Sequence, residues 1–142
     1  MAGISEVGIW EKDGMYISFA AGADITLGSV VRLDATTDGQ VLVGTSAGAA
    51  EAIGVAIAGY RTSRTATDNV VASGNNVTVA TRGVVNVIAG GVITAGDLVE
   101  AGAAGKVVAH TDASAAYASV LGIALSTSAA DGDAVKINLM RG

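Results

Sequence analysis

Short stretches in which apolar and polar residues alternate, separated by turns that contain glycine, run along most of this chain. The clearest is 135–139, where Val, Ile and Leu occupy one face of an extended strand and Lys and Asn the other. Asp-Gly pairs between such stretches, as at Asp131-Gly132, are strong indicators of tight hairpin turns. The pattern predicts an all-β, β-rich protein of short strands, with one or two short helices in the alanine-rich stretches 46–52 and 112–118.

Two halves of the sequence, at about 25–83 and 92–139, repeat the same order of strands and glycine turns. Two copies are too few for a solenoid, which needs three or more units. The repeat therefore predicts a small pseudo-duplicated barrel or sandwich, similar to a β-tulip. The aligned segments are 25–31 with 93–99, 38–41 with 104–107, 53–57 with 121–125, and 74–79 with 132–137.

Residues 1–24 precede the repeat and are expected to form an extended N-terminal arm on a β-rich domain spanning 25–142. Three of the five aromatic residues lie in this arm, namely Trp10, Tyr16 and Phe19. Large rings are preferred anchors at protein interfaces, and the alternative is that these rings close one end of the domain. Tyr16 and Phe19 are an odd number of residues apart, so a regular strand points them to opposite faces. We expect Trp10 and Tyr16 to contact a partner and Phe19 to join the core.

Composition and charge exclude several classes of site. The chain has no Cys and one His, which excludes disulfides, thiolate metal sites, a cysteine nucleophile and a multi-histidine metal centre. Eight Lys and Arg against thirteen Asp and Glu give a net charge of −5, so nucleic acid is not expected as a partner. The start of the chain has no basic and apolar regions of a secretory signal. The most apolar stretch, 83–96, is too short and too rich in glycine for a membrane helix.

Motifs that indicate chemistry are weak in this sequence. Gly44 to Gly48 matches the Gly-x-Ser-x-Gly pattern around Ser46, and His110 follows, but the pattern acts only where a strand turns into a helix above a parallel sheet. A glycine-rich loop is the interpretation we favour. The segment 131–133 lacks the further oxygen ligands of a calcium loop. We predict a protein that is not an enzyme, with no catalytic, cofactor or metal residues and no small-molecule substrate.

Two arginines, Arg61 and Arg64, lie in an insertion that the second half of the repeat lacks. The simple interpretation is a solvated loop. The more specific interpretation is that these guanidinium groups contact an acidic surface of a partner protein.

The order of the glycine and β-branched motifs resembles a known family. Gly28-x-Val30-Val31 is followed by Asp38-Gly39-x-Val41, by 54–57 (GVAI) and by 83–85 (GVV), and the second half repeats the series. This order is similar to that in the capsid cement, or head-decoration, proteins of tailed bacteriophages, and the resemblance covers 13–139.

The resemblance implies a structural virion protein, made in the host cytoplasm, that binds the outer surface of an assembled phage head and stabilises the capsid lattice. Its expected partners are the major capsid protein and two further copies of itself in a homotrimer. The alternatives are another phage structural component, such as a head fibre or tail protein, or a non-catalytic β-rich ligand-binding module. The candidate capsid contacts are Trp10, Tyr16, Arg61 and Arg64.

Overall fold

The computed structural model describes residues 15–44, 52–59, 69–110 and 120–140. Within these residues the chain forms eleven strands and a 3₁₀ turn at Ala103–Gly105, with no α-helix. The all-β prediction is confirmed. The stretches expected to be helical, at 46–52 and 112–118, lie outside the described residues, apart from Ala52, which begins a strand.

The first lobe of the molecule is a circuit of five strands. Strand β1 pairs with β4, β4 with β3, β3 with β5, β5 with β7, and β7 pairs back with β1. All these pairings are antiparallel except the parallel contact of β1 with β4. The strands are β1 (Met15–Ala21), β3 (Val30–Leu33), β4 (Gln40–Val43), β5 (Ala52–Gly59) and the first half of β7 (Asn76–Ile88).

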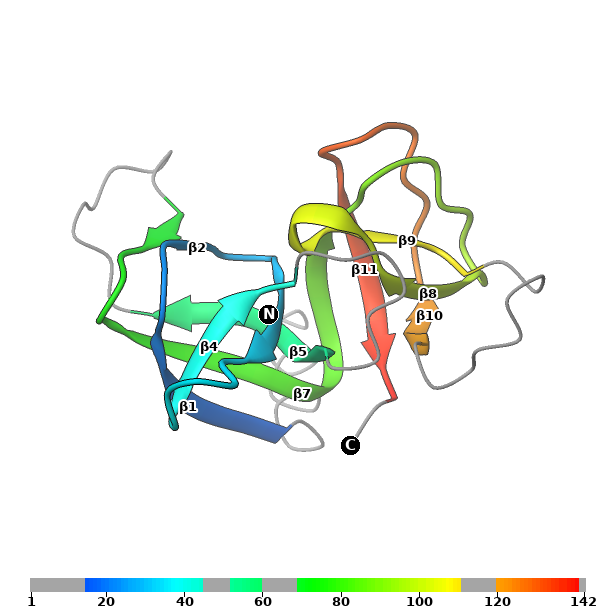
Figure 1. Cartoon of the computed structure of the whole chain (residues 1–142). Helices are drawn as coiled ribbons and strands as arrows, with labels where there is room; N and C mark the ends of the chain where they lie inside the picture. The colour runs from blue at the N-terminus through cyan, green and yellow to red at the C-terminus, as the bar shows by residue number, and fades with distance from the viewer. Residues whose placement is uncertain (1–14, 45–51, 60–68, 111–119, 141–142) are drawn as a thin grey trace, which may run out of the picture.

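The second lobe continues the same sheet from the second half of β7, in the order β7, β11, β10, β8 and β9. Figure 1 shows β7 passing from one lobe into the other, so that this one long strand belongs to both. In the second lobe the return from β9 to β7 is only a single parallel bridge between Ala89 and Val107, so the lobes are not evenly closed barrels. Its strands are β8 (Leu98–Ala101), β9 (Val107–Ala109), β10 (Val120–Ala124) and β11 (Ala134–Leu139).

Equivalent backbone hydrogen bonds relate the two lobes. The Ala21 carbonyl accepts from Gly74 N–H as the Ala89 carbonyl accepts from Gly132 N–H. Strand β1 therefore corresponds to the second half of β7. The expected boundary between the arm and the domain, at residue 24, falls after β1, which already pairs with β4 and β7 of the first lobe. Two further pairs of hydrogen bonds are equivalent. Gly28 N–H donates to the Ala56 carbonyl as Gly96 N–H donates to that of Ala124, and Gly22 N–H donates to the Val41 carbonyl as Gly90 N–H donates to that of Val107.

The buried side chains form two clusters, and alternation along the strands assigns them. Val31 of β3 points into the first lobe, whereas its neighbour Val30 points outward and belongs to the cluster that fills the second lobe. Val55 of β5 and Ala80 of β7 share that outward face, and all three are fully buried. The outer face of the first lobe is thus packed into one continuous core with the second lobe.

Close approach of strands requires glycine at one equivalent position in each lobe. A Cβ on Gly54 would collide with the Ala80 carbonyl oxygen, and a Cβ on Gly122 would collide with the Asn138 carbonyl oxygen. Both glycines are buried. Gly54 lies in β5 next to β7, and Gly122 lies in β10 next to β11. The repeated glycine is therefore a packing requirement in both lobes.

A small second sheet covers the first lobe, where β2 (Ile25–Thr26) pairs antiparallel with β6 (Val70–Val71). The equivalent pairing in the second lobe is the antiparallel bridge between Ile93 and Ser128. Ile25, Val71, Ile93 and Ser128 are all buried, so each lobe closes over its core in the same way.

Candidate capsid-binding surface

The start of β1 carries large apolar side chains on the surface. Met15 is 50% exposed, Tyr16 is 41% exposed and Ile17 is 44% exposed. One edge of β1 pairs with β7 along its length, but β1 meets β4 only at Ala20 and Ala21. An exposed strand with large apolar side chains is a surface suited to strand addition or to docking of a partner.

Tyr16 and Phe19 lie on opposite faces of β1, as their spacing requires. Phe19 is partly buried and packs against the inner cluster of the first lobe, which includes Val77, the residue that pairs with it across the sheet. Phe19 therefore belongs to the core, and Tyr16, which pairs with Ala80, presents its ring to solvent.

The other three candidate contacts, Trp10, Arg61 and Arg64, lie outside the described residues. Of the four candidates the structure therefore places Tyr16 alone. Sequence reasoning missed Ile17 and Leu33, which are 44% and 51% exposed. Alternation predicts one buried face for each strand, and these two residues lie on that face at an end of the first lobe where it is exposed.

A groove of about 450 Å³ lies between the lobes. Its side chains are aliphatic, amide or hydroxyl groups, and none of them titrates, so the groove has no general acid or base of its own. The lining residues come from the end of β2 and the turn after it, from β5, from the residue before β6, and from β7 and β11; they are Thr26, Leu27, Gly28, Ala56, Ile57, Asn69, Asn86, Val87, Ile88 and Ala134.

The single histidine lies away from this groove. The His110 side chain is buried, and its Nδ1 lies 3.5 Å from Oε2 of Glu100, on the neighbouring strand β8. Ser46, the serine of the Gly-x-Ser-x-Gly match, lies outside the described residues.

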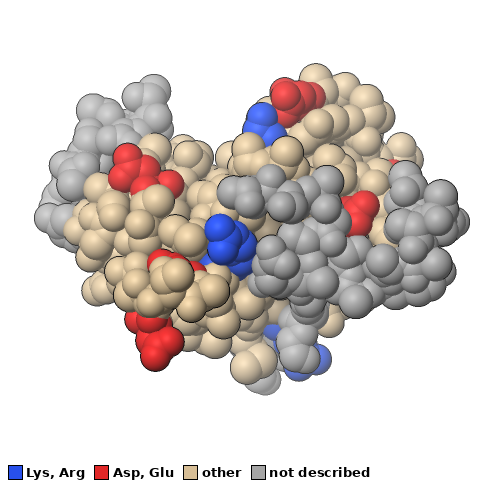
Figure 2. All heavy atoms as spheres, in the orientation of Figure 1, with Lys and Arg blue, Asp and Glu red and all other residues tan. Residues whose placement is uncertain are grey.

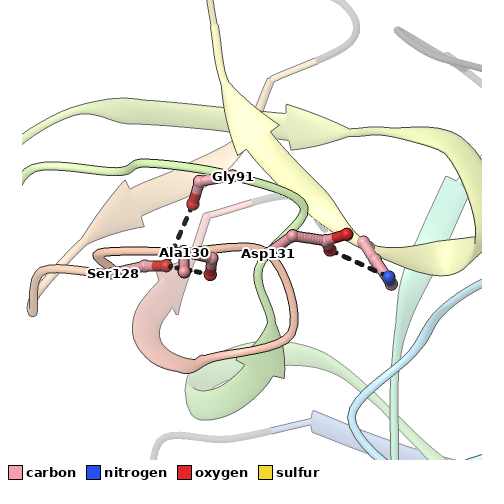
Figure 3. A network of polar contacts seen from close by, with 5 residues as sticks. Gly91, Ser128, Ala130 and Asp131 are labelled. Atoms are coloured by element: carbon pink, nitrogen blue, oxygen red, sulfur yellow. Dashed lines mark hydrogen bonds and ion pairs between the residues drawn. The ribbon is translucent and has the colours of Figure 1, made fainter.

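The segment 131–133 forms a hydrogen-bonded turn with its carboxylates engaged by protein groups. The Asp133 carboxylate accepts from the backbone N–H groups of Ala129 and Ala130 at 3.1 Å each. The Lys106 Nζ lies 2.8 Å from Oδ1 of Asp131, and a dashed line marks this ion pair at Asp131 in Figure 3. In the described part of the chain no group of three or more His, Cys, Asp and Glu residues is placed to hold a metal ion.

Buried Ser128 anchors the loop that precedes this turn. Its hydroxyl lies 2.9 Å from the Gly91 carbonyl oxygen and 3.1 Å from that of Ala130, as Figure 3 shows. Backbone bonds between Ser128 and Ile93 run in both directions. The polar contacts in this region therefore serve the fold.

Charged side chains are dispersed over the surface. On the face shown in Figure 2, Asp and Glu occupy separate places on both lobes, and the coloured Lys and Arg form small patches rather than a stripe. Among the described residues, no helix has the length and hydropathy of a membrane span.

Comparison with known proteins identifies the family. Residues 4–140 match the family described as structural cement protein (E217 gp24/Pam3 gp6). The chain belongs to the phage structural cement protein family. It is thus a structural, capsid-associated component of a phage virion, as the order of its motifs predicted.

A solved structure supports the fold of this cement protein. The head fibre gp8.5 N base of bacteriophage phi29 matches with a TM-score of 0.55 and 18% identity, over 91% of this chain and 96% of that one. Curated protein sequences give no match.

Proposed function

We propose that this cement protein binds the outer surface of an assembled phage head and braces the capsid lattice without catalysing a reaction. Its partner is the major capsid protein. The family match over residues 4–140 is the observation that carries this proposal. The net charge of −5 supports an external position, because an acidic protein is repelled by packaged DNA.

Tyr16 is the contact that we place first, together with Trp10 from the preceding residues. Tyr16 is 41% exposed on β1, and its ring lies on the face opposite Phe19 and the inner cluster of the first lobe. Strand addition along β1 would contribute backbone hydrogen bonds, and the two rings would fill pockets on the capsid. Arg61 and Arg64 would pair with acidic groups on the shell.

We further propose that the protein acts as a homotrimer at three-fold or quasi-three-fold positions of the capsid. The family resemblance is the basis of this stoichiometry. A site shared by three capsid subunits lets one oligomer bridge them, which opposes their separation under internal pressure.

Capsids that lack this protein, mixed with purified protein and imaged by cryo-electron microscopy, test the proposal. The expected result is density on the outer surface, with lower occupancy for Trp10→Ala, for Tyr16→Ala and for a chain lacking residues 1–12. Val92→Ala is the matched control, because Val92 is apolar and 69% exposed but lies on the second lobe away from β1. Unchanged occupancy after removal of residues 1–12 would contradict the role of the arm. Absence of density would contradict outer-surface binding itself.

A head fibre is the second candidate function, and the fold shared with the phi29 fibre base favours it. The same images distinguish the two functions. A cement protein lies flat across capsid subunits, whereas a fibre base carries density that projects away from the shell.

A further inference from the structure

Within one chain the two lobes pack against each other, and the repeat places an equivalent pair of surfaces elsewhere on the molecule. The outer face of the first lobe, made by Val30, Ala52, Val55 and Ala80, shares one buried cluster with one end of the second lobe. At that end of the second lobe, Val85 is 8% exposed and Ala101 is fully buried.

The equivalent end of the first lobe is exposed. Ile17 pairs with Val79 on β7 as Val85 pairs with Ile137 on β11, so Ile17 and Val85 are equivalent. Leu33 pairs with Val41 as Ala101 pairs with Val107, so these two are equivalent as well. Ile17 is 44% exposed and Leu33 is 51% exposed, and we call this pair the open end of the first lobe.

The second lobe carries the complementary surface, which is also incompletely buried. The pairing of Val30 with Val55 is repeated by the pairing of Leu98 with Ile123. Val30 and Val55 are fully buried, but Leu98 and Ile123 are only partly buried. Leu125 is equivalent to Ile57, because each lies two residues after the member of its pair. Ile57 packs against the shared cluster, whereas Leu125 is 47% exposed. The outer face of the second lobe carries the apolar residues Leu98, Val120, Ile123 and Leu125, together with Glu100, which pairs with Val120, and Asn138, which pairs with Ile123.

We propose that a second copy of this chain docks head to tail, with the outer face of its second lobe against the open end of the first lobe. The contact would repeat between chains the packing that joins the lobes within one chain. Such a contact is heterologous, so successive copies form a closed ring when the rotation between them closes, as in a trimer. The inference deepens the proposed self-association and does not depend on binding to the capsid.

Tyr16 is compatible with this arrangement. Adjacent residues of a strand point to opposite faces, so Ile17 faces the neighbouring copy while Tyr16 stays available to the shell. The two contacts can therefore be separated by substitution.

The test uses one variant at each side of the contact. Ile17→Asp places a carboxylate in the open end of the first lobe, and Leu125→Asp places one on the outer face of the second lobe. Each variant is expected to raise the dissociation constant for self-association by about tenfold or more. Size-exclusion chromatography with light scattering measures this constant. Val92→Asp, at an exposed valine outside both surfaces, is expected to leave the oligomer unchanged.

Mixing the two variants gives the decisive result. Each keeps one intact side, so the mixture is expected to form 1:1 dimers that do not grow further. A two-fold contact between identical patches would give no such dimer and would overturn the proposal. A wild-type chain that stays a single copy in solution, together with a double-cysteine variant that forms no crosslink between copies on capsids, would also overturn it. The crosslinking variant carries Ile17→Cys and Ile123→Cys, and the natural chain has no cysteine to interfere.

The capsid assay separates this inference from the proposed function. Loss of capsid binding by Ile17→Asp with self-association intact would assign the open end to the shell and overturn the proposal. Self-association by wild type without any capsid binding would refute the proposed function and leave the head-to-tail contact standing. Circular dichroism confirms that each variant is folded.

Discussion

Ile17 and Val85 occupy equivalent positions in the two lobes, yet Ile17 is 44% exposed and Val85 is 8% exposed. Each pairs with the same kind of partner, Ile17 with Val79 and Val85 with Ile137. The difference in exposure comes from what packs against each residue. Val85 joins a core that includes the outer face of the first lobe, whereas no described part of the chain supplies that cover to Ile17. An exposed apolar end on a repeated unit is a surface where association buries area that the chain alone leaves in water.

Phe19 is expected to contribute to stability and Tyr16 is not. Phe19→Ala removes a ring that packs against the inner cluster, and because the ring is only partly buried we expect a loss of about 2 kcal/mol, below the 3–5 kcal/mol of a fully buried Phe. Tyr16→Ala is expected to change the free energy of unfolding by less than about 0.5 kcal/mol. Chemical denaturation followed by circular dichroism measures both. Equal losses for the two variants would contradict the assignment of Phe19 to the core.

The repeated glycines are expected to be intolerant of any side chain. Gly54→Ala or Gly122→Ala would drive Cβ into a carbonyl oxygen of the neighbouring strand, and we expect a loss of about 2–3 kcal/mol from the forced backbone shift. Gly91→Ala is the control, because a Cβ there meets no atom within 4 Å. Thermal melts of the three variants give the comparison, and a Gly122→Ala melt equal to wild type would show that the strands separate freely.

Ser128→Ala is expected to destabilise the second lobe by about 1–3 kcal/mol, because the partly buried Gly91 carbonyl loses its hydroxyl donor. Ser18→Ala, at an exposed serine of β1, provides the matched control with a change below about 0.5 kcal/mol. Hydrogen exchange around residues 91–93 reports the same loss locally. Protection there that stays at the wild-type level would contradict the anchoring role of Ser128.

The Asp34 carboxyl is expected to titrate below its ordinary value of 3.8. The backbone N–H of Thr36 and then its hydroxyl donate to this carboxylate, and hydrogen bonds to the charged form lower the pKa of Asp34. A lowered folded-state pKa means that the contribution to stability is present above the unfolded pKa and is lost as the pH falls through the folded one.

Nuclear magnetic resonance titration of two variants tests the cause. Thr36→Val removes the hydroxyl donor and keeps the backbone one, so the pKa of Asp34 is expected to rise part of the way towards 3.8. Thr37→Val keeps the backbone group that faces Asp34, so the pKa of Asp34 is expected to stay where it is. A pKa of Asp34 that is the same in wild type and Thr36→Val would rule out the hydroxyl as a cause.

Local sequence patterns determined the strands and their turns. Alternation placed residues 135–139 in a strand, and β11 spans Ala134–Leu139 with Val135, Ile137 and Leu139 buried. The Asp-Gly pairs mark turns in which Gly39 and Gly132 adopt positive φ, a conformation that glycine adopts without strain. These features depend on neighbours in the sequence, so the sequence alone is sufficient to predict them.

Only the tertiary structure decided which equivalent residue is buried. Ile17 and Val85 are both β-branched apolar residues at the same place in a strand, and no local pattern distinguishes them. Their burial differs because β7 continues from one lobe into the other, which sets the outer face of the first lobe against the second. Among the described residues, no such neighbour packs against Ile17 of β1. Exposure is a property of what packs against a strand, and contacts distant in sequence determine it.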